Sequence, residues 1–333
     1  MIKIGINGFG RIGRICFRIM AEQPQKFEVV AINDLIDANY MAYMLKYDSV
    51  FRRFNGTVEA KDGHLLVNGK KIRVTSEKDP VQIKWGEVGV DVVIESTGKF
   101  LTTEDAMKHI QGGAKKVILS APAKDETPMF VYGVNHKELK KELQVISNAS
   151  CTTNCFAPLV KVLHENFGVA EGLMTTIHAV TAEQNIVDVV KEKDHRRGRS
   201  GLINIVPTTT GAAKAAGKVF APVKGRVNGM ALRVPTIDGS CVDFTFRTEK
   251  ETTYEDIKAA LKKAAENEFK GIIEYNQDDI VSGDVIANPC TCMFDSKAGM
   301  EMSKNFFKVI AWYDNEFGYS VQLVRMIEHW MSA

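Results

Sequence analysis

Cys151 stands in a run of small polar residues, Ser147 to Asn154, which reads SNASCTTN. The apolar segment 143–146 before it predicts a buried strand, and the spacing of apolar residues over 156–167 predicts a helix. Cys151 would then lie at a helix N-terminus, where free N–H groups and the positive end of the helix dipole favour an anion. A thiol there loses its proton more easily, and the thiolate is the nucleophilic form. A small buried residue at a tight turn is the alternative, but a packed core does not require so many polar neighbours. We therefore expect Cys151 to be a nucleophile.

A second motif lies near the N-terminus, where residues 8–13 read GFGRIG and fit the pattern G-x-G-x-x-G. The pattern follows an expected strand and opens an expected helix, which is the context of a dinucleotide site. Gly8 would allow the turn, Gly10 would let the backbone approach a pyrophosphate at the helix N-terminus, and Gly13 would let the helix lie close to the sheet. Asp34 follows the next strand and would bind the adenosine ribose hydroxyls, so that NAD is favoured over NADP. The alternative is a glycine turn needed only for packing, with Asp34 as a helix cap.

The elements that carry these motifs alternate between strand and helix over the first 150 residues. This alternation predicts an α/β domain of the Rossmann type, with a mostly parallel sheet and helices on both faces. The expected strands are 3–7, 27–32, 71–75, 90–95, 116–119 and 129–132, and the expected helices are 11–23 and 38–47.

The second half of the chain has longer β-type segments and fewer helices. It predicts an α+β domain with a mainly antiparallel sheet backed by helices on one face. The expected strands are 172–177, 229–234, 240–247 and 306–312, and the expected helices are 211–219, 254–269 and 320–330. The segment 181–210 is long and weakly periodic, and a loop of that length in a compact domain is usually functional.

Composition limits the classes of function. With 333 residues, 45% of them apolar and 25% charged, the chain is long enough for two globular domains. The net charge of +2 argues against an extended nucleic-acid surface. We expect no signal peptide in MIKIGINGFG and no membrane helix, because no apolar stretch approaches 18 residues. The six cysteines form no regular framework, so free thiols in the cytoplasm are expected.

Taken together, the motifs resemble those of phosphorylating, NAD-dependent glyceraldehyde-3-phosphate dehydrogenase, a glycolytic enzyme. INGFGRIGR and SNASCTTN are followed in the family's order by TTTGAAKA at 208–215, RVPT at 233–236 and WYDNEFGYS at 312–320. The resemblance covers essentially the whole chain. It implies an NAD-binding Rossmann domain over residues 1–150, joined by a C-terminal helix over 316–333, and a catalytic α+β domain over 151–315. It also implies a homotetramer.

The resemblance further implies a role for individual residues. Cys151 would be the nucleophile and His178 its base. The substrate phosphate would be bound by Thr181 and Arg233, and the attacking inorganic phosphate by Ser150, Thr210, Gly211 and Arg197, with Thr152 close by. The cofactor would be contacted by Gly8, Gly10, Arg11, Ile12, Gly13, Asp34, Lys78, Ser120 and Asn315, of which Asn315 would fix the nicotinamide carboxamide. At Lys78 the family more often has Arg. No metal is expected, since the spacing of Cys151 and Cys155 does not match zinc patterns.

The implied reaction converts D-glyceraldehyde 3-phosphate, NAD and inorganic phosphate to 1,3-bisphosphoglycerate through a thiohemiacetal and a thioester on Cys151. Two alternatives remain at this stage. One is an erythrose-4-phosphate dehydrogenase, which hydrolyses its thioester. The other is a non-enzymatic nucleotide-binding or RNA-binding role, which the small net charge does not favour.

Overall fold

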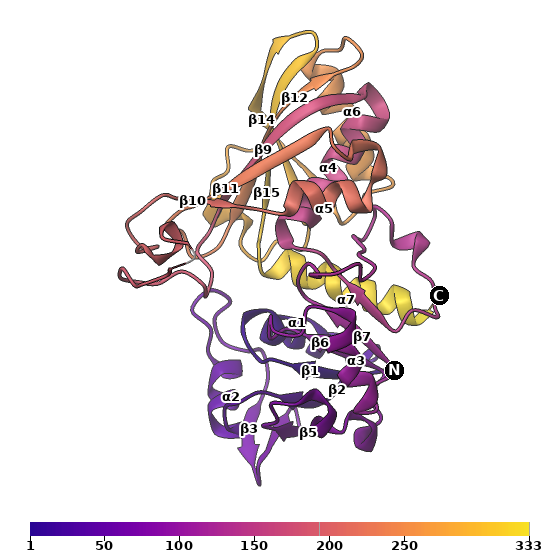
Figure 1. Cartoon of the computed structure of the whole chain (residues 1–333), viewed down its shortest axis with the longest axis vertical. Helices are drawn as coiled ribbons and strands as arrows, with labels where there is room; N and C mark the ends of the chain where they lie inside the picture. The colour runs from indigo at the N-terminus through magenta and orange to yellow at the C-terminus, as the bar shows by residue number, and fades with distance from the viewer. Residues whose placement is uncertain (193, 333) are drawn as a thin grey trace. The chain divides into compact units, whose positions relative to one another are not determined.

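The computed structural model describes residues 1–192 and 194–332. Within them the chain forms two compact units. The first unit holds Met1–Phe130, His136–Ala149 and the chain from Leu323 onward, and the second holds Val131–Asn135 and Ser150–Gln322. Each unit is built around one sheet, and most elements of both are labelled in Figure 1.

The described α-helices are α1 (Arg11–Ala21), α2 (Ala38–Lys46), α3 (Thr103–Gln111), α4 (Cys151–Phe167), α5 (Ala212–Val219), α6 (Tyr254–Glu266) and α7 (Phe317–Ser332). The strands of the first sheet are β1 (Ile2–Asn7), β2 (Phe27–Asn33), β3 (Val58–Lys61), β4 (His64–Val67), β5 (Lys70–Thr75), β6 (Val92–Glu95), β7 (Lys116–Leu119) and β8 (Val145–Ser147). Those of the second are β9 (Val169–His178), β10 (Val206–Thr209), β11 (Val227–Arg233), β12 (Ser240–Thr248), β13 (Ile273–Asn276), β14 (Cys292–Ser303) and β15 (Phe306–Tyr313). No helix in the described part of the chain has the length and apolar character needed to cross a membrane.

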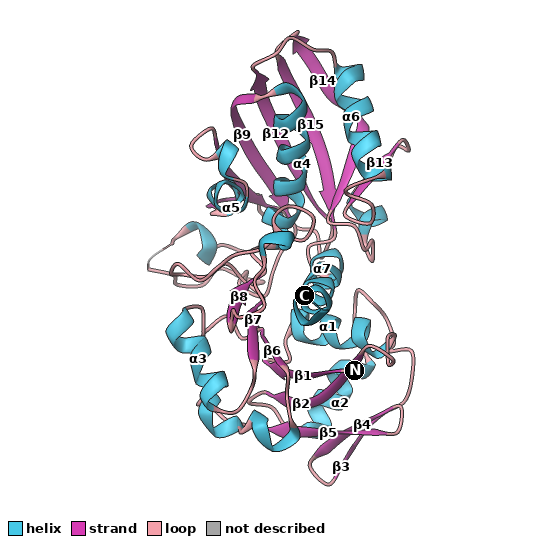
Figure 2. Ribbon diagram, turned by 90° about the vertical axis from the view of Figure 1, so that its right-hand side faces the viewer, coloured by secondary structure: helices cyan, strands magenta, loops and turns pink. Residues whose placement is uncertain are grey.

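The first sheet has the strand order β3-β4-β5-β2-β1-β6-β7-β8. From β5 to β8 all neighbouring strands run parallel, and their order corresponds to the 3-2-1-4-5-6 order of dinucleotide-binding domains. Helices α1 and α2 lie on one side of this sheet and α3 on the other (Figure 2). The Rossmann architecture expected for this half is therefore confirmed.

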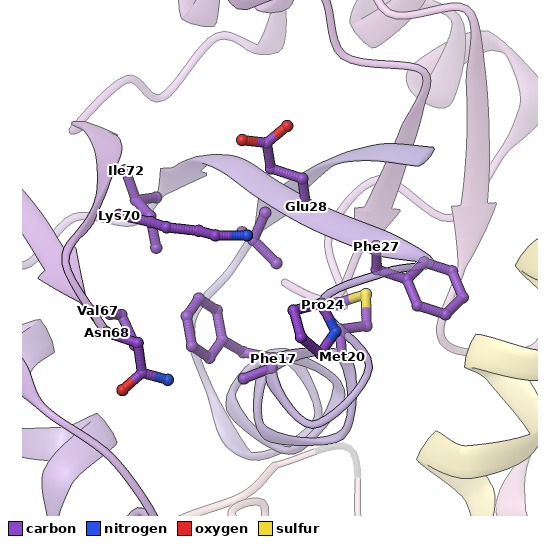
Figure 3. A pocket seen from close by; sticks show the side chains of 11 residues that line it. Phe17, Met20, Pro24, Phe27, Glu28, Val67, Asn68, Lys70 and Ile72 are labelled. Carbon is purple, nitrogen blue, oxygen red and sulfur yellow. The ribbon is translucent and has the colours of Figure 1, made fainter. Parts of the chain in front are cut away.

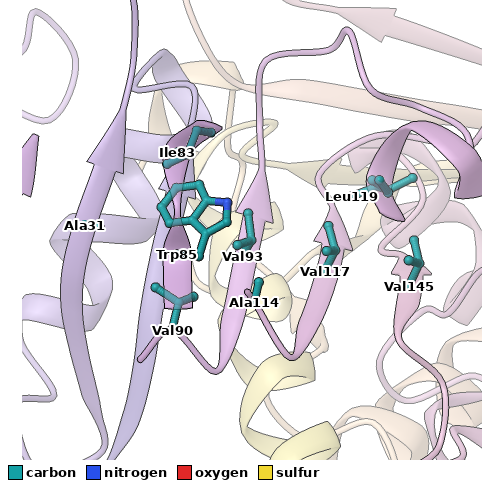
Figure 4. Packing of buried hydrophobic residues seen from close by; sticks show 10 residues of the cluster. Ala31, Ile83, Trp85, Val90, Val93, Ala114, Val117, Leu119 and Val145 are labelled. Atoms are coloured by element: carbon teal, nitrogen blue, oxygen red, sulfur yellow. The ribbon is translucent and has the colours of Figure 1, made fainter. Parts of the chain in front are cut away.

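A cluster of buried apolar side chains fixes α3 to this parallel sheet (Figure 4). Trp85 is fully buried at its centre, between Ala31 of β2 and Val93 of β6. The Trp85 indole N–H donates to Nδ1 of His109, so its one polar atom is satisfied within the core. The cluster holds the strands in place, and the ends of those strands carry the polar groups described below.

The second sheet has the strand order β10-β11-β9-β12-β15-β14-β13. The pairs β11–β9 and β14–β13 are parallel and the other four pairs are antiparallel, as expected for an α+β unit with a mainly antiparallel sheet. Helices α4 and α6 cover one face of it (Figure 2).

Several helices begin where a short polar side chain accepts a backbone N–H. Asp37 caps α2, Thr102 caps α3 and Ser150 caps α4, while Thr253 forms a capping box with Asp256 at α6. Such a cap stabilises a helix by about 0.5–2 kcal/mol. At α1 the capping position is Gly10, which offers no side chain, so its first N–H groups are left for another acceptor.

The structure differs from the expected secondary structure in two respects. The expected strand 129–132 is absent, and only Met129 forms an isolated bridge, with Ser147. The hairpin β3–β4, helix α3 and the long strand β14 were not predicted. Helix α4 begins at Cys151, where the helix N-terminus was expected, and includes the polar residues 152–154 ahead of the apolar segment 156–167.

Candidate functional site

The thiol of Cys151 lies on the first residue of α4. Ser150 caps the helix, because its Oγ accepts the backbone N–H of Thr153 at 3.1 Å. Ala149 before it has φ +56°, a left-handed conformation that turns the chain sharply from β8 into the helix. Strand, turn and helix thus present Cys151, which is half-buried, at an N-terminus whose free N–H groups can stabilise an oxyanion.

His178 is the last residue of β9, and its Nε2 lies 3.4 Å from the Sγ of Cys151. The side chain is 4% exposed, so the imidazole is almost fully removed from water. A thiol and an imidazole at this distance can exchange a proton directly. The pair that the sequence predicted is therefore adjacent in space, within one unit of the fold.

The protonation of this pair differs from the expectation of a thiol that ionises readily. Burial raises the pKa of Cys151 to about 11, although the charge of Arg233 and a hydrogen bond from the Thr152 N–H act in the opposite direction. Burial, and then the charge of Arg233, lowers the pKa of His178 to about 3. Desolvation outweighs the helix N-terminus here. In the free chain the pair is a neutral thiol beside a neutral imidazole.

Arg233 is the third member of this group. It ends β11, and the parallel register of β11 with β9 sets it opposite His178. Its Nη1 lies 2.8 Å from Nδ1 of His178 and 3.4 Å from the carbonyl oxygen of Ala179. That carbonyl is also 2.7 Å from Nδ1 of His178. A guanidinium only donates hydrogen bonds and a carbonyl oxygen only accepts them. Nδ1 therefore either lacks a proton and accepts from Arg233, or carries a proton and donates to the carbonyl of Ala179.

Tyr313 is a residue of this site that the sequence analysis missed. Its hydroxyl is 2.8 Å from the hydroxyl of Thr152, next to the thiol, and 2.8 Å from that of Thr176, two residues before the imidazole. The ring of Tyr313 also packs edge-on against His178. The side chain is 1% exposed. It therefore ties the start of α4 to the end of β9. Its position in the motif WYDNEFGYS was the only signal in the sequence.

Asn315, expected near the nicotinamide, belongs to the same unit and is 5% exposed. Its Oδ1 accepts the hydroxyl of Ser240 at 2.6 Å, and that hydroxyl accepts the backbone N–H of Ala179 at 3.0 Å. Because Ala179 follows His178, one hydroxyl connects the amide of Asn315 to the backbone beside the imidazole.

The other residues expected to bind phosphate are placed around two turns. Both the N–H and the hydroxyl of Thr181 are 2.8 Å from Oε1 of Gln184, and the hydroxyl of Thr210 accepts the N–H of Ala212 at 3.2 Å. Gly211 follows at the cap of α5, where a Cβ would meet open space. Arg197 does not join Arg233, because its guanidinium is paired with Glu183 at 3.2 Å and Asp194 at 3.1 Å.

In the first unit, the glycine-rich turn and Asp34 line one cavity of about 560 Å³. Of the residues expected to contact a cofactor, Gly8, Gly10, Asp34 and Lys78 line it, whereas Arg11, Ile12, Gly13 and Ser120 do not. The Arg11 side chain is paired with Asp48, with Nη1 2.5 Å from Oδ2, so its guanidinium does not line this cavity.

Backbone conformation, packing and space for a ligand account for Gly8, Gly13 and Gly10 respectively. Gly8 has φ +90°, and a Cβ there would lie 2.8 Å from the backbone nitrogen of Thr97. A Cβ on Gly13 would lie 2.2 Å from the carbonyl oxygen of Gly8, so this glycine is required by packing. A Cβ on Gly10 would meet no atom within 4 Å, which leaves room for a ligand at the start of α1. Asp34 stabilises the turn, because its Oδ2 accepts the N–H of Phe9 at 2.6 Å.

A buried polar network beneath this cavity was also missed. Asn33 donates to Asn7 at 2.8 Å, Asn7 donates to Glu95 at 2.6 Å, and Glu95 contacts His109 at 3.0 Å. The sequence did contain a signal, since Asn7, Asn33 and Glu95 each end a parallel strand, and ligands bind at that edge of such sheets.

A different, apolar cavity of about 160 Å³ lies between α1 and strands β2, β4 and β5 (Figure 3). Phe17, Met20 and Pro24 line it from the helix side, and none of its lining residues was expected to bind the cofactor. Across residues 1–192 and 194–332, no three His, Cys, Asp or Glu side chains gather as metal ligands do.

Comparison with known proteins gives matches to both units. Residues 2–103 match the family described as glyceraldehyde 3-phosphate dehydrogenase, NAD binding domain, and residues 150–315 match its C-terminal domain. The chain is 60% identical over 328 residues to the glyceraldehyde-3-phosphate dehydrogenase of Salmonella typhimurium and to glyceraldehyde-3-phosphate dehydrogenase A of Escherichia coli K12. It is 58% identical to that of Shimwellia blattae, and in each case the match covers 98% of both chains.

Proposed function

Because the chain belongs to the glyceraldehyde-3-phosphate dehydrogenase family, we propose that it oxidises D-glyceraldehyde 3-phosphate with NAD and inorganic phosphate to 1,3-bisphosphoglycerate. The observation that carries the proposal is the contact of 3.4 Å between Cys151 Sγ and His178 Nε2 at the start of a helix. In this proposal residues 1–150 and the helix over 316–333 serve the cofactor, and residues 151–315 serve the chemistry.

The residues of the first cavity suit NAD. The open space at Gly10 can hold a pyrophosphate, to which backbone N–H groups at the start of α1 donate, and the carboxylate of Asp34 accepts hydrogen bonds from the ribose hydroxyls. Lys78 supplies positive charge at the same cavity. The proposal also keeps Ser120 and Asn315 as cofactor contacts, and neither of them lines this cavity. NAD, when bound, accepts the hydride, and the protein supplies orientation and charge.

Cys151 begins the reaction by adding to the aldehyde, and His178 takes the proton. Since the thiol and the imidazole are both neutral in the free chain, this proton passes along the Sγ–Nε2 contact as the sulfur attacks. The backbone N–H of Cys151 lies at the helix start, where it can stabilise the oxyanion of the thiohemiacetal. Loss of hydride leaves a thioester on the same sulfur.

Arg233 has two roles in this proposal. It binds the substrate phosphate together with Thr181, and it controls the proton of His178. While Nη1 of Arg233 donates to Nδ1, the ring proton must sit on Nε2, facing the thiol. When a phosphate attracts the guanidinium, Nδ1 can donate to the carbonyl of Ala179 instead, and Nε2 becomes an acceptor. Substrate binding thereby generates the base.

The attacking phosphate is assigned to the hydroxyls of Ser150, Thr152 and Thr210, the N–H of Gly211 and the guanidinium of Arg197. Hydroxyl, N–H and guanidinium groups are the donors that phosphate oxygens require. Arg197 must leave Glu183 and Asp194 to take part, so its guanidinium exchanges these two carboxylates for the phosphate on binding.

The proposal includes a homotetramer in the cytoplasm. The loop over 181–205 exposes several large apolar side chains, namely Ile186, Val187, Val190, Ile203 and Ile205. Exposed apolar groups of this kind are typical of a surface that another subunit covers. None of the six cysteines forms a disulfide within the described residues, and a reducing compartment keeps the thiol of Cys151 reactive.

The test is NADH formation from glyceraldehyde 3-phosphate and NAD, with and without inorganic phosphate. Sustained turnover that requires phosphate is expected. Equal turnover without phosphate would mean that water resolves the thioester, and erythrose 4-phosphate would become the substrate to examine. Cys151→Ser is the matched variant. It should bind NAD normally and lose turnover, and a variant with near-normal activity would refute the role of Cys151.

A further inference from the structure

Two buried carboxyl groups face each other in the second unit. Asp238 is 2% exposed and Asp314 is fully buried. Oδ1 of Asp238 accepts the N–H of Gly239 at 2.8 Å, whereas its Oδ2 is buried and receives no hydrogen bond from the described residues. The pairing of Ser240 with Tyr313 brings the two segments together, and the carboxyl group of Asp238 interacts there with that of Asp314. Two ionised carboxylates only accept hydrogen bonds, so a bond between these groups requires a proton on one of them.

The backbone around Asp314 decides which group is ionised. Its Oδ1 accepts the N–H of Glu316 at 2.8 Å and that of Phe317 at 2.6 Å, and its Oδ2 accepts the N–H of Ala287 at 2.7 Å. Three such bonds stabilise a negative charge, whereas Asp238 receives only one. Asp314 is therefore the carboxylate and Asp238 the acid.

The negative charges near the pair also favour a protonated Asp238. Burial, and then the charge of Asp314, raises the pKa of Asp238 to about 8. Glu316 adds a further negative charge that opposes ionisation of either partner. Asp284 lies on the short helix Ser282–Val285 next to the pair, and its own carboxylate is occupied by the N–H of Val281 at 2.8 Å.

The pair lies beside the amide that the proposed function assigns to the nicotinamide. Asp314 precedes Asn315, and Asp238 is two residues before Ser240, whose hydroxyl donates to Oδ1 of Asn315 at 2.6 Å. The segments 238–240 and 314–315 are thus joined by this hydroxyl, and the two carboxyl groups interact beside it.

We propose that Asp238 and Asp314 share one proton, and that this acid–carboxylate bond positions Asn315 for the nicotinamide carboxamide. Asp238 is thereby a positioning residue, and this inference rests on the function proposed above. When the proton leaves, two buried carboxylates repel each other and separate, and Asn315 moves with Asp314. Cofactor affinity consequently falls as Asp238 ionises at alkaline pH.

Two variants distinguish this bond from mere packing. Asp238→Asn keeps a donor toward Asp314 and cannot ionise, and Asp238→Leu keeps the volume but loses the donor. Asp279→Asn, at a surface carboxylate that is paired with exposed Lys297, is the control. The measurements are NAD affinity by calorimetry between about pH 6.5 and 9.5, and the infrared carbonyl stretch of a protonated carboxyl group over the same range.

The wild type should show the infrared band near neutral pH and lose it with a midpoint near pH 8. Its NAD affinity should fall across the same pH range. The total fall should be about tenfold for each unit by which the pKa of Asp238 in the NAD complex exceeds its pKa in the NAD-free protein. Asp238→Asn should lack the band and bind NAD independently of pH, and Asp238→Leu should bind weakly throughout. An absent band in the wild type, or a pH profile of Asp238→Asn equal to that of the wild type, would overturn the inference. If the proposed function alone were wrong, NAD binding and turnover would be absent while the infrared band still titrated.

Discussion

Nη1 of Arg233 lies 2.8 Å from Nδ1 of His178, because the last residues of β11 and β9 are paired in a parallel register. The charge of Arg233 influences the pKa of both the Cys151 thiol and the His178 imidazole. The positive charge lowers the pKa of Cys151 and also lowers that of His178. Arg233 therefore favours the thiolate while it opposes an imidazolium beside it.

This contact predicts the effect of Arg233→Leu. Without the guanidinium the pKa of Cys151 should rise further and that of His178 should rise from about 3. Alkylation of the thiol at fixed pH should slow, and kcat/KM should fall at least about ten- to hundredfold, which corresponds to the roughly 1.5–3 kcal/mol of a hydrogen bond to a charged group. Alkylation by iodoacetamide and steady-state kinetics measure the two effects. Arg247→Leu, at a surface arginine of the same sheet, is the control and should change neither.

Replacement of the imidazole tests the proposed base. His178→Asn should lower kcat by about 10²- to 10⁴-fold, the usual contribution of a positioned acid or base. NAD affinity should remain unchanged, because the bonds that hold Asn315 run through the Ser240 hydroxyl and the Ala179 backbone N–H and do not involve the imidazole. His195→Asn removes an exposed histidine from the loop and should keep full activity. Comparable losses in the two variants would contradict the assignment.

The glycines of the first unit give a matched pair of variants. Gly13→Ala places a Cβ about 2.2 Å from the Gly8 carbonyl, so it should destabilise the fold by about 1–3 kcal/mol as well as weaken NAD binding. Gly10→Ala has open space and φ −72°, which alanine adopts without strain. It should weaken NAD binding and leave the melting temperature unchanged. Thermal unfolding and NAD titration separate the two, and equal melting temperatures would disprove the packing role of Gly13.

His136 predicts a loss of stability in acid. Burial, and then the charge of His329, lowers the pKa of His136 to about 4. The unfolded chain binds a proton on this histidine below its ordinary value of 6.5, and the folded chain does not. The folded state therefore loses stability as the pH falls from about 6.5 to about 4. The melting temperature of His136→Gln should fall less over this range than that of the wild type, and parallel profiles would show that His136 contributes nothing.

The sequence by itself determined which residues can take part in catalysis or ligand binding and in which helices, strands or turns they lie. The spacing of Gly8, Gly10 and Gly13 between an apolar strand and a helical pattern predicted a strand-to-helix turn, and the period of apolar residues predicted most strands and helices. The run around Cys151 indicated a helix start for the same local reason, although the helix proved longer. Features set by neighbours in sequence were accessible to sequence reasoning.

Only the tertiary structure decided which of these residues meet. The 27-residue separation of Cys151 and His178 becomes a contact of 3.4 Å because α4 packs on the sheet that β9 belongs to. The hydroxyl of Tyr313 reaches Thr152 and Thr176 only through the pairing of β12 with β9 and β15. The pKa values of Cys151 and His178 likewise depend on burial, which arises when distant segments exclude water together. The order of residue types along the chain specifies the helices, strands and turns. The packing of these elements against one another sets the distances between side chains and the dielectric environment around them.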